Sequence, residues 1–160
     1  MAREIERKFL VRGNAWRSAE HTYFCQGYLN SDKHRTVRIR VADDAAQLTV
    51  KGLTTGPTRA EFEYTIPVDD AKELLDLCEK PLIEKNRRVI PHGGLTWEVD
   101  EFLGDNLGLV VAEIELESED QEFERPEWIG EEVTDDPRYF NSNLVTTPYK
   151  TWNPANPKPQ

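Results

Sequence analysis

The 160-residue chain has no apolar run of the roughly 20 residues that a membrane-spanning helix needs. Its opening residues, MAREIERKFLV, are interrupted by charges where a secretory signal would need about 7–15 consecutive apolar residues. Only two cysteines are present, Cys25 and Cys78, and their spacing matches no zinc, haem or redox motif. We therefore expect a cytoplasmic protein with no membrane partner, whose two cysteines are reduced and structural.

Positive charge is also scarce, since 20 Lys and Arg face 30 Asp and Glu and the net charge is −10. Nucleic acids and anionic membranes attract basic surfaces, so this balance argues against both as partners. The three histidines, His21, His34 and His92, lie in or beside expected turns without metal-ligand spacing, and we interpret them as surface residues. An acidic protein can still bind an anion if its cations gather in one place.

The chain shows no internal repeat and no linker that would divide it. At this length it can bury one hydrophobic core without the support of disulfides. We predict one domain over residues 1–147. Residues 148–160 form a tail rich in Pro and Asn, and we expect this tail to be disordered or loosely packed.

The chain is rich in alternation of charged and apolar residues, the period-two pattern of strands with two different faces. Clusters of Gly, Asn, Asp and Pro separate the alternating segments. The pattern predicts about eight strands, over residues 3–11, 22–30, 36–42, 46–52, 59–67, 83–91, 95–102 and 109–117. It also predicts an amphipathic helix over 69–78 and a second helical segment between about 136 and 144. The predicted fold class is mainly β (α+β).

The charged face of each predicted strand tends to carry one sign of charge. Arg38 and Arg40 share a face, whereas Glu61 and Glu63 share a face on another strand. Like charges two residues apart repel, but such clusters suit a ligand of opposite charge: divalent cations for carboxylates and phosphate for Arg and Lys. Two arrangements remain open, because periodicity alone does not say whether these faces lie in water around an apolar core or line the inside of a barrel.

In their order along the chain, these motifs resemble the CYTH superfamily, the triphosphate tunnel metalloenzymes. Glu4-x-Glu6-x-Lys8 resembles the family's ExExK signature in the first strand. The resemblance continues over residues 3 to about 145 through Arg38-x-Arg40, Lys51, Glu61-x-Glu63, Lys85-x-Arg87, Asp100 and Glu113-x-Glu115. It implies an antiparallel, roughly eight-stranded β-barrel with flanking helices and a charged tunnel. The segment from Trp128 to Tyr139 resembles the part of small members where a helix closes one tunnel mouth.

The resemblance also implies roles for the charged residues. The residues expected to hold Mg²⁺ or Mn²⁺ are Glu4, Glu6, Glu61, Glu63, Asp100, Glu113 and Glu115. The residues expected to bind the triphosphate are Lys8, Arg38, Arg40, Lys51, Lys85 and Arg87. Because Mg²⁺ usually takes one or two protein carboxylates and keeps its waters, some of the acidic residues would orient Arg and Lys instead. Glu4 and Glu6 are the first candidates for direct metal contact.

Lys85 and Tyr28 are the candidate catalytic residues. Among other cations the pKa of Lys85 could fall far enough for it to act as a base, and the Tyr28 hydroxyl could reach the tunnel from the end of its strand. The simpler roles stay open: Lys85 would then only bind phosphate, and Tyr28 would only pack within the barrel.

The expected activity is metal-dependent hydrolysis of a triphosphate. The small bacterial members that the chain resembles point to inorganic tripolyphosphate, cleaved to pyrophosphate and phosphate, and nothing in the sequence marks a purine pocket. Two alternatives stay open. One is an organic-triphosphate enzyme of the same family, such as a class IV adenylyl cyclase or a nucleoside or thiamine triphosphatase. The other is a non-catalytic polyphosphate- or nucleotide-binding module. A homodimer is compatible with the sequence, but no interface is evident in it.

Overall fold

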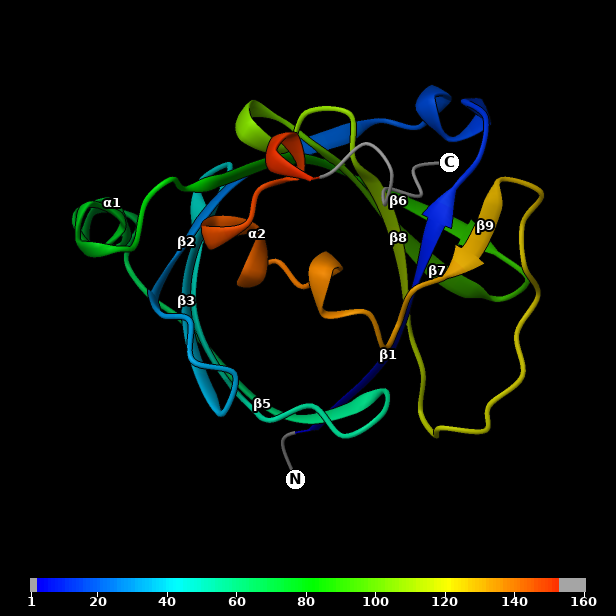
Figure 1. The fold of residues 1–160 in the computed structure, drawn as a ribbon, viewed down its shortest axis with the longest axis horizontal. Helices are drawn as coiled ribbons and strands as arrows, with labels where there is room; N and C mark the ends of the chain where they lie inside the picture. The colour runs from blue at the N-terminus through cyan, green and yellow to red at the C-terminus, as the bar shows by residue number, and fades with distance from the viewer. Residues whose placement is uncertain (1–2, 153–160) are drawn as a thin grey trace.

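The computed structural model describes residues 3–152, which form nine strands and two short α-helices (Figure 1). The strands are β1 (Arg3–Val11), β2 (His21–Asn30), β3 (Arg35–Ala42), β4 (Ala45–Gly52), β5 (Thr58–Thr65), β6 (Ile83–His92), β7 (Leu95–Phe102), β8 (Val110–Glu115) and β9 (Ile129–Glu132). The helices are α1 (Val68–Leu77) and α2 (Asn143–Thr146). Four 3₁₀ turns accompany them: η1 (Ala15–Ser18), η2 (Gly104–Asn106), η3 (Pro137–Tyr139) and η4 (Tyr149–Thr151).

Eight of the strands close into an antiparallel barrel in the order β5-β4-β3-β2-β6-β7-β8-β1. The first strand closes it, because one edge of β1 pairs with β8 over Glu6–Leu10 while the start of its other edge pairs with β5, Glu4 opposite Arg59. Farther along that second edge, Phe9 and Val11 pair with β9 instead. The barrel is therefore sealed at the start of β1, and β9 lies outside it (Figure 1).

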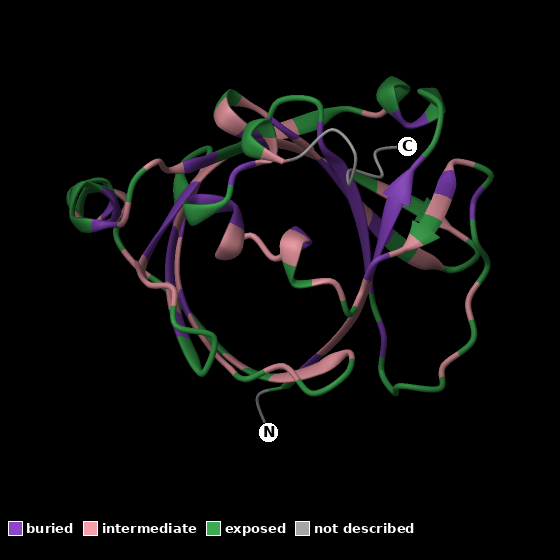
Figure 2. Cartoon of the chain, viewed as in Figure 1, coloured by how far each residue is buried: buried purple, intermediate pink, exposed green. Residues whose placement is uncertain are grey.

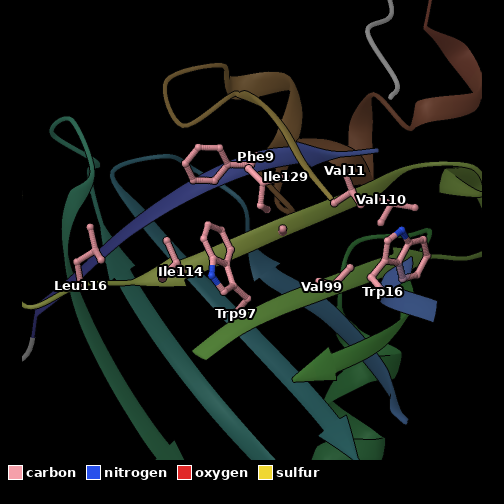
Figure 3. Packing of buried hydrophobic residues seen from close by; sticks show 10 residues of the cluster. Phe9, Val11, Trp16, Trp97, Val99, Val110, Ile114, Leu116 and Ile129 are labelled. Carbon is pink, nitrogen blue, oxygen red and sulfur yellow. The ribbon is translucent and has the colours of Figure 1, made fainter. Parts of the chain in front are cut away.

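The outer surface of the barrel is apolar where β1, β7 and β8 meet. Phe9, Trp97 and Ile114 are at most 1% exposed there, and the Phe9 and Trp97 rings meet edge to face with centroids 5.5 Å apart. Phe123 and Trp128 in the loop before β9 pack against this cluster, whose buried residues are drawn in Figure 3. Figure 2 shows the consequence: β1 and β8 are largely buried, whereas β5 is mostly exposed. A hydrophobic core thus lies outside the ring of strands.

Helix α1 covers a second part of the outer surface, over β2, β3 and β4. Ala71 and Leu75 on its inner face pack against Ile39 and Ala46. Gly27 on β2 allows this close approach, since a Cβ atom there would lie 2.7 Å from the Cβ of Cys78. Cys25 and Cys78 are both free, as the sequence predicts.

The inside of the barrel is apolar only at one end. On the inner faces of their strands, Leu10 and Phe102 come after the charged residues and Val111 comes before them, and all three pack against Val133 and Leu144. The segment that carries η3 and α2 lies inside the ring of strands when the barrel is viewed along its axis (Figure 1). It fills this end, which leaves the charged part of the interior as a separate region.

The mainly β barrel and its eight strands confirm the predicted fold, and α1 confirms the predicted helix. The predicted helix between 136 and 144 is wrong in detail: the backbone extends at Phe140, with φ −72° and ψ 131°, and leaves two separate turns, η3 and α2. Strand β9 was not predicted. No helix within residues 3–152 is long and apolar enough to cross a membrane.

The expectation of a loosely packed tail is wrong for residues 148–152. The Tyr149 backbone N–H donates to Asn106 Oδ1 at 2.8 Å, and Trp152 Nε1 donates to the Thr147 carbonyl at 3.0 Å. The Trp152 ring also lies edge to face with Tyr139, with centroids 5.2 Å apart. These contacts pack residues 148–152 against the rest of the chain. The rest of the tail, 153–160, lies outside the described residues.

Candidate active site in the barrel interior

One cavity occupies the charged part of the barrel and holds about 720 Å³ of empty space, counting the space at its open side. Five strands contribute basic side chains to its wall, and all six residues predicted to bind the triphosphate are among these side chains. The basic lining residues are Lys8, Arg38, Arg40, Lys51, Arg59, Lys85 and Arg87. The charged faces therefore point inward, which decides between the two arrangements that the sequence left open.

The wall formed by β3 carries positive charge without close carboxylates. Arg40 makes no ion pair with any residue between 3 and 152, and its Nε donates to Gln26 Oε1 at 2.9 Å. Arg38 donates to Thr49 Oγ1 at 3.1 Å, and its buried Nε has no partner in the described chain. The only carboxylate that Arg38 approaches among these residues is the exposed Glu63, at 3.6 Å. Buried charges without partners are costly, so this wall suits an anionic ligand.

Two guanidinium groups crowd one aromatic ring beside this wall. The Cζ atoms of Arg40 and Arg87 lie 4.8 and 4.9 Å from the centre of the Phe24 ring. Burial, followed by the charges of Arg38 and Arg87, lowers the pKa of Arg40 to about 9. A bound anion would oppose both causes, because it would offset the charge of Arg40 and its repulsion with its neighbours.

The wall formed by β6 and β7 carries positive charge that is already paired. Asp100 accepts from Lys85 Nζ at 2.7 Å and from the Nε and Nη2 atoms of Arg87 at 2.7 and 2.8 Å. Burial would raise the pKa of Asp100, but Arg87 and Lys85 outweigh it and hold that pKa well below its usual range. Both Asp100 oxygens are thus occupied, and they fix the two cations in position.

Lys85 is 1% exposed and its Nζ also donates to Asn141 Oδ1 at 2.8 Å. Burial lowers the pKa of Lys85 to about 7, and nearby Arg87 and Arg40 act in the same direction while Asp100 opposes them. Tyr28 lines the same cavity, but it is only 5% exposed and packs with Leu10 and Ile83. The structure therefore places both candidate catalytic residues at the cavity.

The inward side chains of β1 include both signs of charge, Glu4 and Glu6 being followed by Lys8. Lys8 lies between Glu6, at 3.1 Å, and Glu113, and these carboxylates raise its pKa despite its burial. On the next strands, Lys51 Nζ lies 2.7 Å from Glu4 and 3.7 Å from Glu61. Each of these lysines is thus held between carboxylates at the edge of the cavity.

Carboxylates gather at the end of the barrel away from the inserted segment. Burial, followed by the charge of Glu6, raises the pKa of Glu4 to about 7. Burial and the charges of Glu61 and Glu6 likewise raise the pKa of Glu115, which lies opposite Glu6 in the β1–β8 pairing. Burial also raises the pKa of Glu98. Carboxylates crowded until they resist ionisation are the donor set that a hard divalent cation would stabilise.

No group of three or more His, Cys, Asp or Glu side chains within residues 3–152 is arranged to hold a metal ion by itself. An ion held by one or two carboxylates, together with waters and substrate phosphates, needs no such group. The arrangement of these side chains does not fit a closed structural site such as that of zinc, which needs four protein ligands. The residues present are therefore compatible with a metal that is shared with the substrate.

The predicted acidic residues take different positions. Glu6 and Glu113 line the cavity, whereas Glu4, Glu61, Glu63 and Asp100 do not line it but approach the cations that do. Glu115 neither lines the cavity nor forms an ion pair within residues 3–152 and is exposed, although the charges of Glu61 and Glu6 act on it. All seven nevertheless belong to one electrostatic cluster.

Sequence reasoning missed several residues that line the cavity, among them Arg59, Thr134 and Asn141. Arg59 shares the period-two face of Glu61 and Glu63, so the same alternation could have identified it. Thr134 and Asn141 belong to the segment inserted into the barrel, where no periodicity marks an inward side chain. Only the tertiary structure brings them to the cavity.

The fold and the barrel interior, which carries both positive and negative side chains, define the class of protein. The chain belongs to the CYTH domain family, whose model matches residues 2–148. Triphosphatases of this family are generally metal-dependent.

Two curated relatives are similar over nearly their whole length. One, named inorganic triphosphatase, from Acetivibrio thermocellus, is 56% identical over 154 residues, which is 95% of this chain and 99% of the relative. The other, with the same name, from Nitrosomonas europaea, is 36% identical and covers 89% of this chain and 96% of the relative. A crystal structure described as an inorganic triphosphatase is 34% identical, with a TM-score of 0.62 over 91% of this chain and 95% of that one.

Proposed function

We propose that this protein is an inorganic triphosphatase, a phosphoanhydride hydrolase that cleaves tripolyphosphate to pyrophosphate and phosphate inside its barrel. The observation that carries the proposal is the β3 wall, where buried Arg38 and half-buried Arg40 present positive charge with no close carboxylate partner. The relative that is 56% identical and named inorganic triphosphatase supports the same reaction. A linear triphosphate carries four or five negative charges, which suits a cavity with seven basic side chains.

Arg38, Arg40 and Arg59 would bind the phosphate oxygens first, because their guanidinium groups keep hydrogen-bond donors free of carboxylates and can bind phosphate in a bidentate manner. Lys8, Lys51, Lys85 and Arg87 would complete the set from the other walls. Their carboxylate partners hold them in place before substrate arrives, so little reorganisation is needed at the moment of reaction.

We infer that the metal ion is Mg²⁺ or Mn²⁺. Glu4 and Glu6, with Glu115 and Glu61 close by, would hold the ion, because the charges of these carboxylates act on one another. The ion would supply charge that stabilises the developing negative charge on phosphate oxygens. Asp100, whose two oxygens already accept from Lys85 and Arg87, would orient these cations instead of binding metal.

We infer that Lys85 accepts a proton from the attacking water. A lysine whose pKa lies at about 7 is neutral in part of the molecules at physiological pH, which is the form that a base requires. Asp100 and Asn141 hold Nζ in position for this role. Tyr28, at the same cavity, is the candidate for a second contact to the reacting group.

The compartment that we propose is the cytoplasm, because both cysteines are free and a reducing compartment keeps thiols in that form.

The experiment that tests the function is release of phosphate and pyrophosphate from tripolyphosphate, ATP and thiamine triphosphate, each with Mg²⁺, with Mn²⁺ and with a chelator. The proposal predicts metal-dependent release that is fastest from tripolyphosphate, with equal amounts of phosphate and pyrophosphate. Release of pyrophosphate from ATP alone would instead identify a cyclase. Binding of tripolyphosphate without turnover under any metal would identify a binding module.

A further inference from the structure

Asn141 reaches the cavity from the segment inserted into the barrel, between η3 and α2. It lies on neither of the walls that carry the basic residues, and its side chain joins both of them. Asn141 Oδ1 accepts a hydrogen bond from Lys85 Nζ at 2.8 Å and one from Gln26 Nε2 at 3.0 Å. This side chain therefore links the paired wall to the unpaired one.

The hydrogen-bond network fixes which end of each amide faces which neighbour. Arg40 has only donors, so its contact with Gln26 must end on Oε1, which turns Gln26 Nε2 toward Asn141. Asn141 must then accept this hydrogen bond through Oδ1, and this holds whether Lys85 is protonated or neutral. Gln26 is fully buried, so it has no water with which to exchange these contacts. The orientation of Asn141 follows from the chemistry of its neighbours.

The other end of the Asn141 amide is left with two N–H donors. Within residues 3–152, no acceptor forms a hydrogen bond with Nδ2, although Asn141 is only partly exposed and lines the cavity. We propose that Asn141 is a further substrate-binding residue, whose Nδ2 donates to a phosphate oxygen of the bound triphosphate. This inference rests on the proposed function and adds a residue to its binding site.

Such a contact would have a role that the cations do not fill. A neutral donor held rigidly by two hydrogen bonds adds directional binding without adding charge next to Lys85. A cation in the same place would lower the pKa of Lys85 further and repel Arg40. Asn141 would also make the inserted segment part of the binding site rather than only the cover of one barrel end.

The test is calorimetric titration of tripolyphosphate into the full chain in the presence of a chelator, so that binding is measured without turnover. We expect Asn141→Ala to bind about ten- to hundredfold more weakly, the range for a hydrogen bond to a charged group. Asn141→Asp should bind more weakly still, because it keeps the shape and the Oδ1 acceptor but places negative charge where Nδ2 was. Asn143→Ala is the matched control, since Asn143 Nδ2 donates to the Pro137 carbonyl within the same segment.

Wild-type affinity in Asn141→Ala would overturn the inference. Wild-type affinity in Asn141→Asp would overturn it too, because binding would then need only the Oδ1 acceptor and not the Nδ2 donor. An equal loss in Asn143→Ala, accompanied by lower thermal unfolding midpoints, would overturn it too, because a disturbed segment would then explain the effect. If the wild type binds tripolyphosphate but hydrolyses none, the proposed activity fails while the Asn141 contact is judged on the affinities alone. If the wild type does not bind it, both fail.

Discussion

Two walls of the same cavity both carry positive charge, but the charge is unpaired on one wall and paired with a carboxylate on the other. On β3, Arg38 and Arg40 lie partly or wholly out of water with no close carboxylate. On β6 and β7, Lys85 and Arg87 share Asp100, whose oxygens accept from both. The first wall is incomplete without an anion, whereas the second is complete by itself.

This difference separates residues that bind the ligand from residues that also support the fold. Removing a cation that has no partner relieves repulsion and removes a contact with the ligand, so the cost appears in function. Removing the partner of a buried cation leaves an uncompensated charge, so the cost appears in stability as well. Four variants, ordered from the largest expected effect, test this difference and the charge of the carboxylates beside the walls.

The combined substitution of Arg38→Gln and Arg40→Gln should lower kcat/KM for tripolyphosphate about a thousandfold, since each lost charged hydrogen bond is worth roughly 1.5–3 kcal/mol. The thermal unfolding midpoint should stay the same or rise, because neither arginine has a close carboxylate to lose. Glu63→Gln is the control: its contact with Arg38 is exposed and 3.6 Å long, so kcat/KM should change less than about threefold. Retained kcat/KM in the double variant would remove the β3 wall from the site.

Lys85→Arg should lower kcat about a hundredfold, because arginine keeps the charge but does not release a proton in proteins. In the wild type, kcat should rise as the pH passes through about 7, where Lys85 loses its proton and becomes a base. The variant should lose that rise. Steady-state kinetics between pH 5.5 and 8.5 would check both, and a variant with the wild-type profile would leave Lys85 as a phosphate-binding residue only.

Asp100→Asn should destabilise the protein by about 3 kcal/mol, because Lys85 and Arg87 would keep their buried charges without a counter-charge. Urea unfolding with a chelator would measure this. The comparison between the walls fails if Asp100→Asn costs no more stability than the double substitution on β3.

Glu4→Gln should change how stability depends on pH. The pKa of Glu4 is about 7 in the folded protein and 4.5 for an ordinary glutamate, so the folded protein binds more protons than the unfolded chain between these pH values. The stability from this group is present below pH 4.5 and is lost as the pH rises through 7. Without metal, the wild type should lose about 2 kcal/mol over this range. Urea unfolding of Glu4→Gln at several pH values should show a flatter slope; an identical slope would assign the loss to other groups.

Much of the cavity wall could be predicted from the sequence because strand geometry fixes it. Side chains two residues apart in a strand share a face, so finding Arg38 inside also places Arg40 inside. The choice between an inward and an outward charged face came from the resemblance to a family, since periodicity is the same in both arrangements. The apolar cluster around Phe9 and Trp97 shows that the core lies outside the ring of strands.

Other features depend on contacts between distant segments, which no local pattern encodes. The pairing of Asp100 with Lys85 depends on the register of β6 with β7. The position of Asn141 at the cavity depends on the path of the inserted segment. That path would differ if the predicted helix between 136 and 144 had formed. Strand β9 has only four residues, too few for alternation to stand out, and it exists because Phe9 and Val11 offer it a free strand edge.

The most direct test of the account is a crystal structure of the Lys85→Arg variant with tripolyphosphate and Mn²⁺, whose anomalous signal locates the ion. The account predicts phosphate oxygens bound by both Arg38 and Arg40, and the manganese peak beside Glu6 at the carboxylate end of the cavity. A triphosphate held away from β3, with Arg38 and Arg40 still unpartnered, would contradict it.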